Sequence, residues 1–251
     1  MTEAAWHVRR IGSGSETAVP LIGLHGWGQT GASLVPLAEL LPRKDIILFD
    51  LPGFGLTPML APGAGTADYA EALAARLPSD RPAILIGHSF GARVALRYAA
   101  RHPERLKALI LIAGAGLKRR RGPVFRIRAF LLRLLGRLAR GIDRLSGTRL
   151  NEAYKMRFGS ADYRAAGPLR PTFVATVNED LSEIAASIEI PVLLIYGAED
   201  RETPPEFGRR YHALMPRSEL HVLAGFGHLD ILGPGRFQCA HLIAEFLKGL
   251  S

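Results

Sequence analysis

Cysteine is almost absent from this sequence of 251 residues, whose one thiol belongs to Cys239. A single cysteine cannot form an internal disulfide, so nothing in the composition calls for an oxidising compartment. Cys239 stands in an apolar segment near the C-terminal end, and we expect it to be a buried core residue.

Long hydrophobic runs are also missing. The longest, ALILIAGAGL at 108–117, is about half as long as a membrane-spanning helix needs to be. The opening stretch, MTEAAWHVRRIG, lacks the apolar run and the small-residue cleavage site of a secretory signal. The sequence therefore predicts a soluble, cytoplasmic protein, with peripheral attachment to a membrane surface as the alternative.

Acidic residues are scarce in only one part of the chain. Residues 118–149 contain eleven lysines and arginines against one acid, Asp143, whereas the whole chain has a net charge of +9. Nearly all of the excess positive charge therefore lies in this segment. Such a local excess marks one surface of a protein and does not indicate a general affinity for nucleic acid.

Short apolar runs alternate with helical patterns along most of the chain. Continuous apolar strands between helices predict an α/β fold, with a mostly parallel sheet covered by helices on both faces. The predicted buried strands are 18–24, 45–50, 82–87, 106–113, 191–197 and 218–224. The predicted helices lie near 31–41, 66–77, 90–101, 204–214 and 235–248.

The alternation stops between about residues 117 and 187. This segment has helical patterns but no convincing strand, and it includes the basic residues. We therefore expect a core formed by residues 1–116 and 188–251, with a basic helical cap inserted at 117–187.

A Gly-x-Ser-x-Gly stretch, Gly87 to Gly91, joins a predicted strand directly to a predicted helix. Glycines on both sides of Ser89 remove Cβ atoms where the chain must turn sharply, which leaves the serine hydroxyl exposed at the tip of the strand. The N–H groups at the start of the helix point toward the same place. This context predicts that Ser89 is a nucleophile.

A nucleophilic serine needs a base, and the base needs an acid that orients it. His228 stands in a glycine-rich loop after the last predicted strand, and Asp200 follows the strand at 191–197. Sites of parallel sheets form along the edge where strands end, and Ser89 lies at that edge too. The order Ser89, Asp200, His228 is also the order expected for this architecture.

Acyl transfer requires donors for a developing oxyanion. The backbone N–H of Phe90, which follows the nucleophile, is one predicted donor. The backbone N–H of Trp27, in the LHGWGQTG loop, is the other. We expect His25 to shape that loop and His88 to pack beside the turn. This chemistry requires no metal and no organic cofactor.

Taken together, these motifs resemble the α/β-hydrolase fold superfamily over nearly the whole chain. The resemblance implies that Ser89 is the nucleophile, Asp200 the acid and His228 the base, with Trp27 and Phe90 as oxyanion donors. Serine at the nucleophile position argues against the dehalogenation and epoxide opening found in relatives with aspartate there. The matching stretches are LHGWG, DLPGFG, GHSFGAR, HPERLKALIL, YGAEDRETPP and GFGHLD.

Within the superfamily the resemblance points in several directions. LHGWG and DLPGFG are similar to the pimeloyl-acyl-carrier-protein methyl ester carboxylesterases, which usually have tryptophan where His88 stands. GHSFGAR and VNEDL (177–181) are similar to other bacterial hydrolases. The resemblance implies cleavage of a carboxylic ester or thioester through an acyl-enzyme. The alternative is a cofactor-free carbon–carbon bond hydrolase or lyase of the same fold.

The cap contains a predicted helix with an arginine stripe. At about 100° per residue its arginines fall within a narrow arc, and large apolar side chains fall on the opposite side. The arginines are Arg126, Arg133, Arg137, Arg140 and Arg144. The apolar residues are Phe130, Leu131, Leu134, Leu135, Leu138, Ile142 and Leu145.

The stripe has one structural and three functional interpretations. In the structural one, the apolar side of this cap helix covers the active site and the arginines are simply solvated. In the others they dock an acidic carrier protein, rest on anionic lipid, or bind a substrate carboxylate. A distant alternative to an enzyme is a non-catalytic protein that binds anionic surfaces through this cap. Nucleic acid is disfavoured as a partner, because the arginines lack interleaved stacking aromatics.

Overall fold

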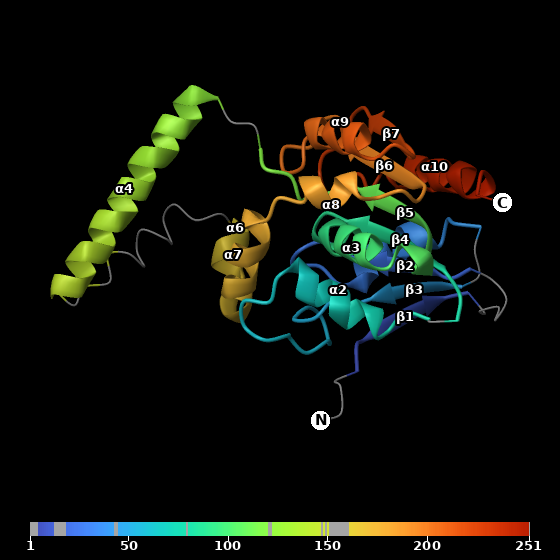
Figure 1. Ribbon diagram of the computed structural model, residues 1–251, viewed down its shortest axis with the longest axis horizontal. Coiled ribbons are helices and arrows are strands. Elements are labelled where there is room, and N and C mark those ends of the chain that lie inside the picture. The colour runs from blue at the N-terminus through green and yellow to red at the C-terminus, as the bar shows by residue number, and fades with distance from the viewer. Residues whose placement is uncertain are drawn as a thin grey trace.

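Seven strands form one sheet in the computed structural model of the chain, in the order β1-β3-β2-β4-β5-β6-β7 (Figure 1). The structure describes residues 5–12, 19–42, 45–78, 80–119, 122–146, 148, 150 and 161–250, without the side chains of 123–129, 133 and 161. The strands are β1 (Val8–Ile11), β2 (Leu21–Leu24), β3 (Ile46–Phe49), β4 (Ala83–His88), β5 (Leu106–Ile112), β6 (Val192–Gly197) and β7 (Ser218–Leu223).

All six predicted strands are present, and they pair in parallel. β1 was not predicted, because its VRRI pattern has few apolar residues; it pairs antiparallel with β3 at the edge of the sheet. The prediction that 218–224 is a buried strand was wrong in one respect. This strand, β7, forms the other edge of the described sheet, and its residues are half-buried or exposed because an edge strand has a neighbouring strand on one side only.

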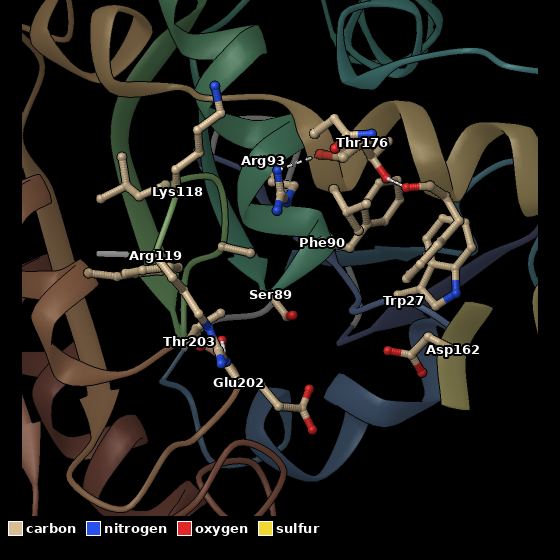
Figure 2. Close-up of a pocket in the computed structure, with 16 residues that line it drawn as sticks. Trp27, Ser89, Phe90, Arg93, Lys118, Arg119, Asp162, Thr176, Glu202 and Thr203 are labelled. Carbon is tan, nitrogen blue, oxygen red and sulfur yellow. Dashed lines mark hydrogen bonds between the residues drawn. The ribbon is translucent and has the colours of Figure 1, made fainter. Parts of the chain in front are cut away.

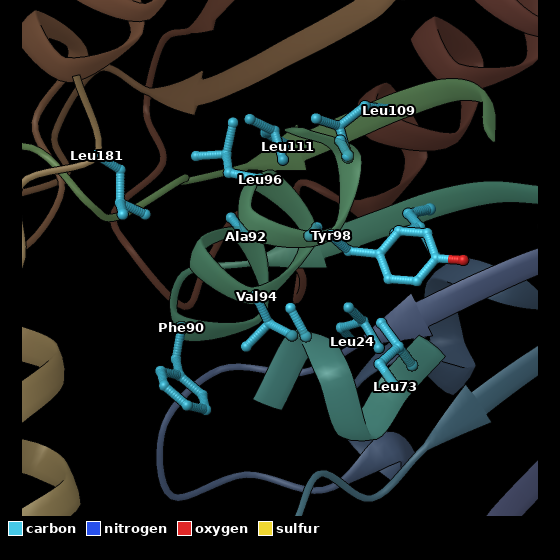
Figure 3. Close-up of a cluster of buried hydrophobic side chains, with 14 of the residues drawn as sticks. Leu24, Leu73, Phe90, Ala92, Val94, Leu96, Tyr98, Leu109, Leu111 and Leu181 are labelled. Carbon is cyan, nitrogen blue, oxygen red and sulfur yellow. The ribbon is translucent and has the colours of Figure 1, made fainter. Parts of the chain in front are cut away.

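Helices cover both faces of the sheet. One core cluster joins it to α2 (Thr66–Ala74), α3 (Phe90–Arg101), α8 (Ser182–Ala186) and α9 (Pro205–Leu214). Figure 3 shows part of this cluster, with Val94 and Tyr98 of α3 among strand and helix side chains. Burial of each such side chain stabilises the fold by about 1.5–3 kcal/mol.

The second cluster joins the opposite face to η1 (Gly31–Leu34), α1 (Val35–Ala38) and α10 (Arg236–Lys248). Cys239 of α10 belongs to it and is fully buried, as the sequence predicted. All the predicted helices of the core are present, and the short turn η2 (Pro103–Arg105) follows α3.

The described part of the segment between β5 and β6 is helical. It contains α4 (Pro123–Ser146), α6 (Ala161–Ala165), η3 (Gly167–Leu169) and α7 (Arg170–Asn178), and then α8. The last of these packs on α3 and α9. In Figure 1, α4 extends away from the sheet and its covering helices. It runs as one helix through Gly136 and Gly141.

Candidate active site

The turn between β4 and α3 holds Ser89 in a conformation that few residues other than glycine adopt. Its φ is 50° and its ψ is −105°. A Cβ on Gly87 would lie 2.6 Å from the Ala92 Cα, and one on Gly91 would lie 2.2 Å from the Leu24 carbonyl oxygen. Both positions therefore require glycine. The sharp turn places the serine between the end of the strand and the start of the helix.

The three residues predicted to act together do lie together. His228 Nε2 is 2.9 Å from Ser89 Oγ, and His228 Nδ1 is 2.7 Å from Asp200 Oδ2. The Asp200 side chain is fully buried, and that of His228 is only 9% exposed. The Nδ1–H of the ring donates to the carboxylate, which leaves Nε2 free to accept the serine proton.

The loop after β6 holds Asp200 in its charged form. Its Oδ1 accepts the backbone N–H groups of Glu202 at 2.7 Å and Thr203 at 2.8 Å. Burial alone would raise the pKa of Asp200, but the hydrogen bonds from His228 and Thr203 lower it below its usual value. A charged acid at this place can stabilise a protonated His228 ring.

Thr203 is a neighbour of Asp200 and His228 that was not predicted. Its hydroxyl lies 2.8 Å from Asp200 Oδ2, 3.1 Å from His228 Nδ1 and 2.9 Å from the Ala113 carbonyl oxygen. It therefore connects the acid to the end of β5. Its position three residues after Asp200, just before two prolines, is the only sequence signal for it.

Glu202 was also not predicted. Its Oε2 lies 3.5 Å from His228 Nε2, and its side chain is 66% exposed. A second carboxylate therefore stands on the solvent side of the ring.

The LHGWGQTG loop is held by His25. The fully buried ring accepts the Leu51 N–H at Nε2, at 2.9 Å, and contacts the Gly26 carbonyl oxygen through Nδ1 at 2.7 Å. Burial lowers the pKa of His25, so the ring is neutral and can serve as both donor and acceptor. The expectation that His25 shapes this loop is confirmed.

Trp27 and Phe90, the predicted oxyanion donors, stand side by side at the site. Their rings are 5.3 Å apart, and both residues line the cavity that contains Ser89. Within the described chain, neither backbone N–H donates to a backbone or side-chain acceptor. Phe90 begins α3, where N–H groups have no partner inside the helix. Both groups are available to a ligand.

The cavity beside Ser89 has a volume of about 510 Å³ and is partly apolar and partly charged. Aromatic rings of the core and of α7 meet along it, with the Trp27 and Phe173 rings 5.0 Å apart. Figure 2 shows Arg93 and Lys118 on one side of Ser89, and Asp162 and Glu202 on the other. A substrate of moderate size with polar or charged ends would fit such a space.

Three arginines of the predicted stripe can be placed. Arg137, Arg140 and Arg144 of α4 are all exposed, and none of them lines the cavity. The side chains of Arg126 and Arg133 lie outside the described residues. The apolar face of α4 is exposed as well, with Phe130 at 60% and Leu138 at 56%. The described part of α4 therefore gives no support to a cap helix that covers the active site with its leucines.

In the part of the chain that the structure describes, no group of three or more His, Cys, Asp or Glu side chains is arranged to hold a metal ion. None of the described helices is both long enough and apolar enough to span a bilayer.

The chain is similar to known enzymes over most of its length. A family model described as the Alpha/beta hydrolase family matches residues 21–237. A pimeloyl-[acyl-carrier protein] methyl ester esterase of Chromobacterium violaceum is 29% identical over 239 residues, which are 90% of this chain and 91% of that protein. One of Neisseria meningitidis serogroup C is 30% identical over 251 residues, or 90% and 93% of the two chains.

Solved structures share the fold. A membrane phospholipase A described as a bacterial virulence factor gives a TM-score of 0.73 at 23% identity and covers 98% of this chain and 86% of its own. MenH from S. aureus gives a TM-score of 0.70 at 21% identity and covers 100% and 99%. At such identities the likeness concerns the fold alone.

Proposed function

The chain belongs to the alpha/beta hydrolase family, and from this premise we propose that it is a serine carboxylesterase that cleaves an ester or thioester through an acyl-enzyme on Ser89. The observation that carries the proposal is the chain of contacts from Ser89 Oγ to His228 at 2.9 Å and from His228 to Asp200 at 2.7 Å. Nucleophile, base and acid are thus within reach of one another at the cavity.

In the first step, Ser89 Oγ attacks the carbonyl carbon of the substrate while its proton moves to His228 Nε2. Asp200 keeps the Nδ1–H in place and stabilises the positive ring that forms. The carbonyl oxygen becomes an oxyanion, which accepts the backbone N–H groups of Trp27 and Phe90. Loss of one such donor typically lowers the rate by about 10²–10³-fold.

In the second step, the proton on His228 passes to the leaving alcohol or thiol, and the acyl group stays on Ser89. Water then enters, gives its proton to His228 Nε2 and attacks the acyl carbonyl from the same side. Collapse of the second oxyanion returns the proton to Ser89 Oγ and releases the acid. All proton transfers use the one ring nitrogen that faces Ser89.

A fluorophosphonate probe tests this proposal, because it reacts with activated serines only. Wild-type protein is expected to be labelled and to hydrolyse p-nitrophenyl butyrate, and Ser89→Ala is expected to lose both. Ser187→Ala is the matched control, since Ser187 is an exposed serine whose hydroxyl donates to the Ile184 carbonyl oxygen within its own helix end. Labelling that persists in Ser89→Ala would overturn the proposal.

We also propose that an acidic carrier protein docks on the arginines of α4 and delivers the acyl group. Arg137, Arg140 and Arg144 are exposed on α4, and their positive charge is complementary to an acidic partner surface. The relatives named as pimeloyl-[acyl-carrier protein] methyl ester esterases support this choice of partner. Free small-molecule esters would enter the same cavity without using α4.

Charge reversal tests the partner. Arg137, Arg140 and Arg144 are changed together to Glu, and binding to acyl-carrier protein is measured by calorimetry at low salt. We expect binding to be lost while hydrolysis of p-nitrophenyl butyrate is unchanged. The control reverses Arg9, Arg10 and Arg209, which are exposed outside α4. Equal loss in both triple variants would reject α4 as the docking surface. Binding of wild type to anionic vesicles alone would assign α4 to a membrane.

A further inference from the structure

Arg93 is the one charged residue of the nucleophile's helix that faces the cavity. It stands four residues after Ser89, one turn along α3. Figure 2 shows its side chain beside Phe90 and near Ser89, with Thr176 of α7 next to it. One guanidinium nitrogen donates to the Thr176 carbonyl oxygen at 2.7 Å. The side chain is thereby fixed between the core and the cap.

This bond uses only one of the five N–H groups of the guanidinium. Within the described residues, no carboxylate lies within ion-pair distance of Arg93. The nearest acids have partners of their own. Glu179 accepts both the backbone N–H and the hydroxyl of Thr66, and Asp180 accepts the hydroxyl and backbone N–H of Ser182.

A charged group in such a place is unfavourable without a counter-ion. Burial lowers the pKa of Arg93, but a guanidinium stays protonated at neutral pH even so. The positive charge is therefore retained and only weakly compensated by the protein. An anion that enters the cavity would supply the missing charge and accept the unused N–H groups.

The surroundings favour an anion on this side of the cavity. Lys118, exposed at the rim, lies on the same side of Ser89 as Arg93, whereas Asp162 and Glu202 lie on the other side (Figure 2). Arg119 also lines the cavity, but its guanidinium is bonded to the carbonyl oxygens of Arg201 and Glu202. Arg93 is thus the half-buried cation of this side, and Lys118 is the exposed one.

We infer that Arg93 is a specificity-determining residue that binds a carboxylate of the substrate, an inference that rests on the proposed esterase function. The planar fork of an arginine matches a carboxylate through two parallel hydrogen bonds. One helical turn separates Arg93 from Ser89, about 6 Å along the axis. The preferred substrate is therefore an ester with a carboxylate a few carbon atoms from the carbonyl that Ser89 attacks, its chain packed on Phe90 and Phe173.

Matched esters test the inference. Mono-p-nitrophenyl glutarate carries an acyl carboxylate, and p-nitrophenyl valerate is its neutral counterpart of equal chain length. For Arg93→Met we expect kcat/KM to fall by about 10- to 100-fold on the glutarate ester, the usual size of a lost hydrogen bond to a charged group. Hydrolysis of the valerate ester should change little. Arg93→Lys should be intermediate, because it keeps the charge and loses the fork.

A second pair of esters tests whether Arg93 binds a carboxylate on the leaving group instead of one on the acyl chain. Phenyl valerate and 3-carboxyphenyl valerate differ only in the leaving group. Selectivity for the carboxyphenyl ester that is lost in Arg93→Met supports the subsite and places the anion on the leaving side. No dependence on Arg93 in either pair overturns the inference.

Arg97→Met is the control for the helix itself. Arg97 lies one turn further along α3, bonds to Thr66 and approaches Glu179 at 4.0 Å, and does not line the cavity. We expect it to leave the preference between the glutarate and valerate esters unchanged. If Arg93→Met lowers the hydrolysis of both esters equally, Arg93 has a structural role only and the inference is wrong.

Binding without turnover separates this inference from the proposed function. Glutarate and valerate are titrated calorimetrically into Ser89→Ala and into the double variant with Arg93→Met. If glutarate binds more tightly than valerate to Ser89→Ala, and this difference is lost in the double variant, the subsite is supported. This holds even if the wild type hydrolyses no ester and is not labelled by the fluorophosphonate, because that result would reject only the esterase function. Equal binding of both acids would overturn the subsite while leaving the esterase intact.

Discussion

The ring of His88 lies against the ring of His228, with the ring centres 5.1 Å apart and a tilt of 37° between the planes. His88 Nε2 is also 3.3 Å from the backbone carbonyl oxygen of His228, and Nδ1 is 3.3 Å from Gln29 Oε1. Because a neutral ring carries one N–H, it donates to only one of these oxygens at a time. The residue before the serine therefore supports the loop that carries the base, which adds a role to the packing expected from the sequence.

His88 should make the stability of the protein depend on pH. Burial, and then the neighbouring His228, lower its pKa from 6.5 to about 3. Between these two values the unfolded chain binds a proton that the folded protein does not. The free energy of unfolding should therefore be greatest above pH 6.5 and fall as the pH is lowered, by up to about 1.4 kcal/mol per pH unit for this group.

Urea unfolding at pH 7, 6 and 5 measures this effect in the wild type and in His88→Gln. The variant should lose less stability per pH unit than the wild type. His25 has a lowered pKa for the same reason and keeps part of the slope in the variant. Identical slopes in the two proteins would mean that folding does not lower the pKa of His88.

Thr203→Val should slow the reaction without weakening substrate binding. The hydroxyl that is removed connects Asp200 Oδ2 with the Ala113 carbonyl oxygen, and valine keeps its shape. We expect kcat to fall by about tenfold, which corresponds to one buried hydrogen bond, with KM nearly constant. Thr57→Val removes a buried hydroxyl that accepts the His7 N–H away from the site, and it should lower stability but not kcat.

Asp200→Asn should remove most of the activity while the fold is kept. The amide oxygen can still accept the N–H groups of Glu202 and Thr203, but the side chain no longer carries the charge that stabilises a protonated His228. We expect kcat to fall by about 10³–10⁴-fold. Single-turnover hydrolysis measures the change, and an unaltered melting temperature shows that the protein is folded. A loss of less than tenfold would assign the orienting role to another acid.

Gly91→Ala should disrupt the turn that carries Ser89. The new Cβ would meet the Leu24 carbonyl oxygen at 2.2 Å and the His25 carbonyl oxygen at 2.8 Å, both in the backbone. The expected loss of stability is about 3 kcal/mol or more, measured by thermal unfolding, together with loss of fluorophosphonate labelling.

Gly141→Ala is the opposite case. Among the described residues outside the helix's own backbone, nothing lies within 4 Å of a Cβ placed on this exposed glycine of α4. The substitution should leave esterase activity unchanged and stabilise the helix by about 1 kcal/mol at most. A loss of activity in Gly141→Ala would show that the position of α4 matters to the reaction itself.

Cys239 should be unreactive in the folded protein. Its thiol is buried in the core, and burial raises its pKa to about 12. Since the thiolate is the reactive form, labelling by a thiol reagent such as DTNB should follow the unfolded fraction of the protein. Rapid labelling of the native protein at pH 8 would contradict this placement of α10.

Much of the core was predictable, because its signals are local. A buried parallel strand must be apolar along its whole length, so the runs that became β2 to β6 were visible without any partner. The turn at Ser89 was visible for a similar reason: only glycine fits at Gly87 and Gly91. β1 was not predicted because this edge strand, with two exposed arginines, contains no continuous apolar run.

The candidate site divides in the same way. The sequence by itself determined the residue types and chain order of Ser89, Asp200 and His228, since strand ends of a parallel sheet share one edge. Only the tertiary structure decided what surrounds them. It set the Thr203 hydroxyl against Asp200, placed α4 away from the sheet, and left the half-buried Arg93 without a carboxylate within ion-pair distance among the described residues. Such contacts join residues far apart in the chain, and their energies depend on burial and distance, which no local pattern records.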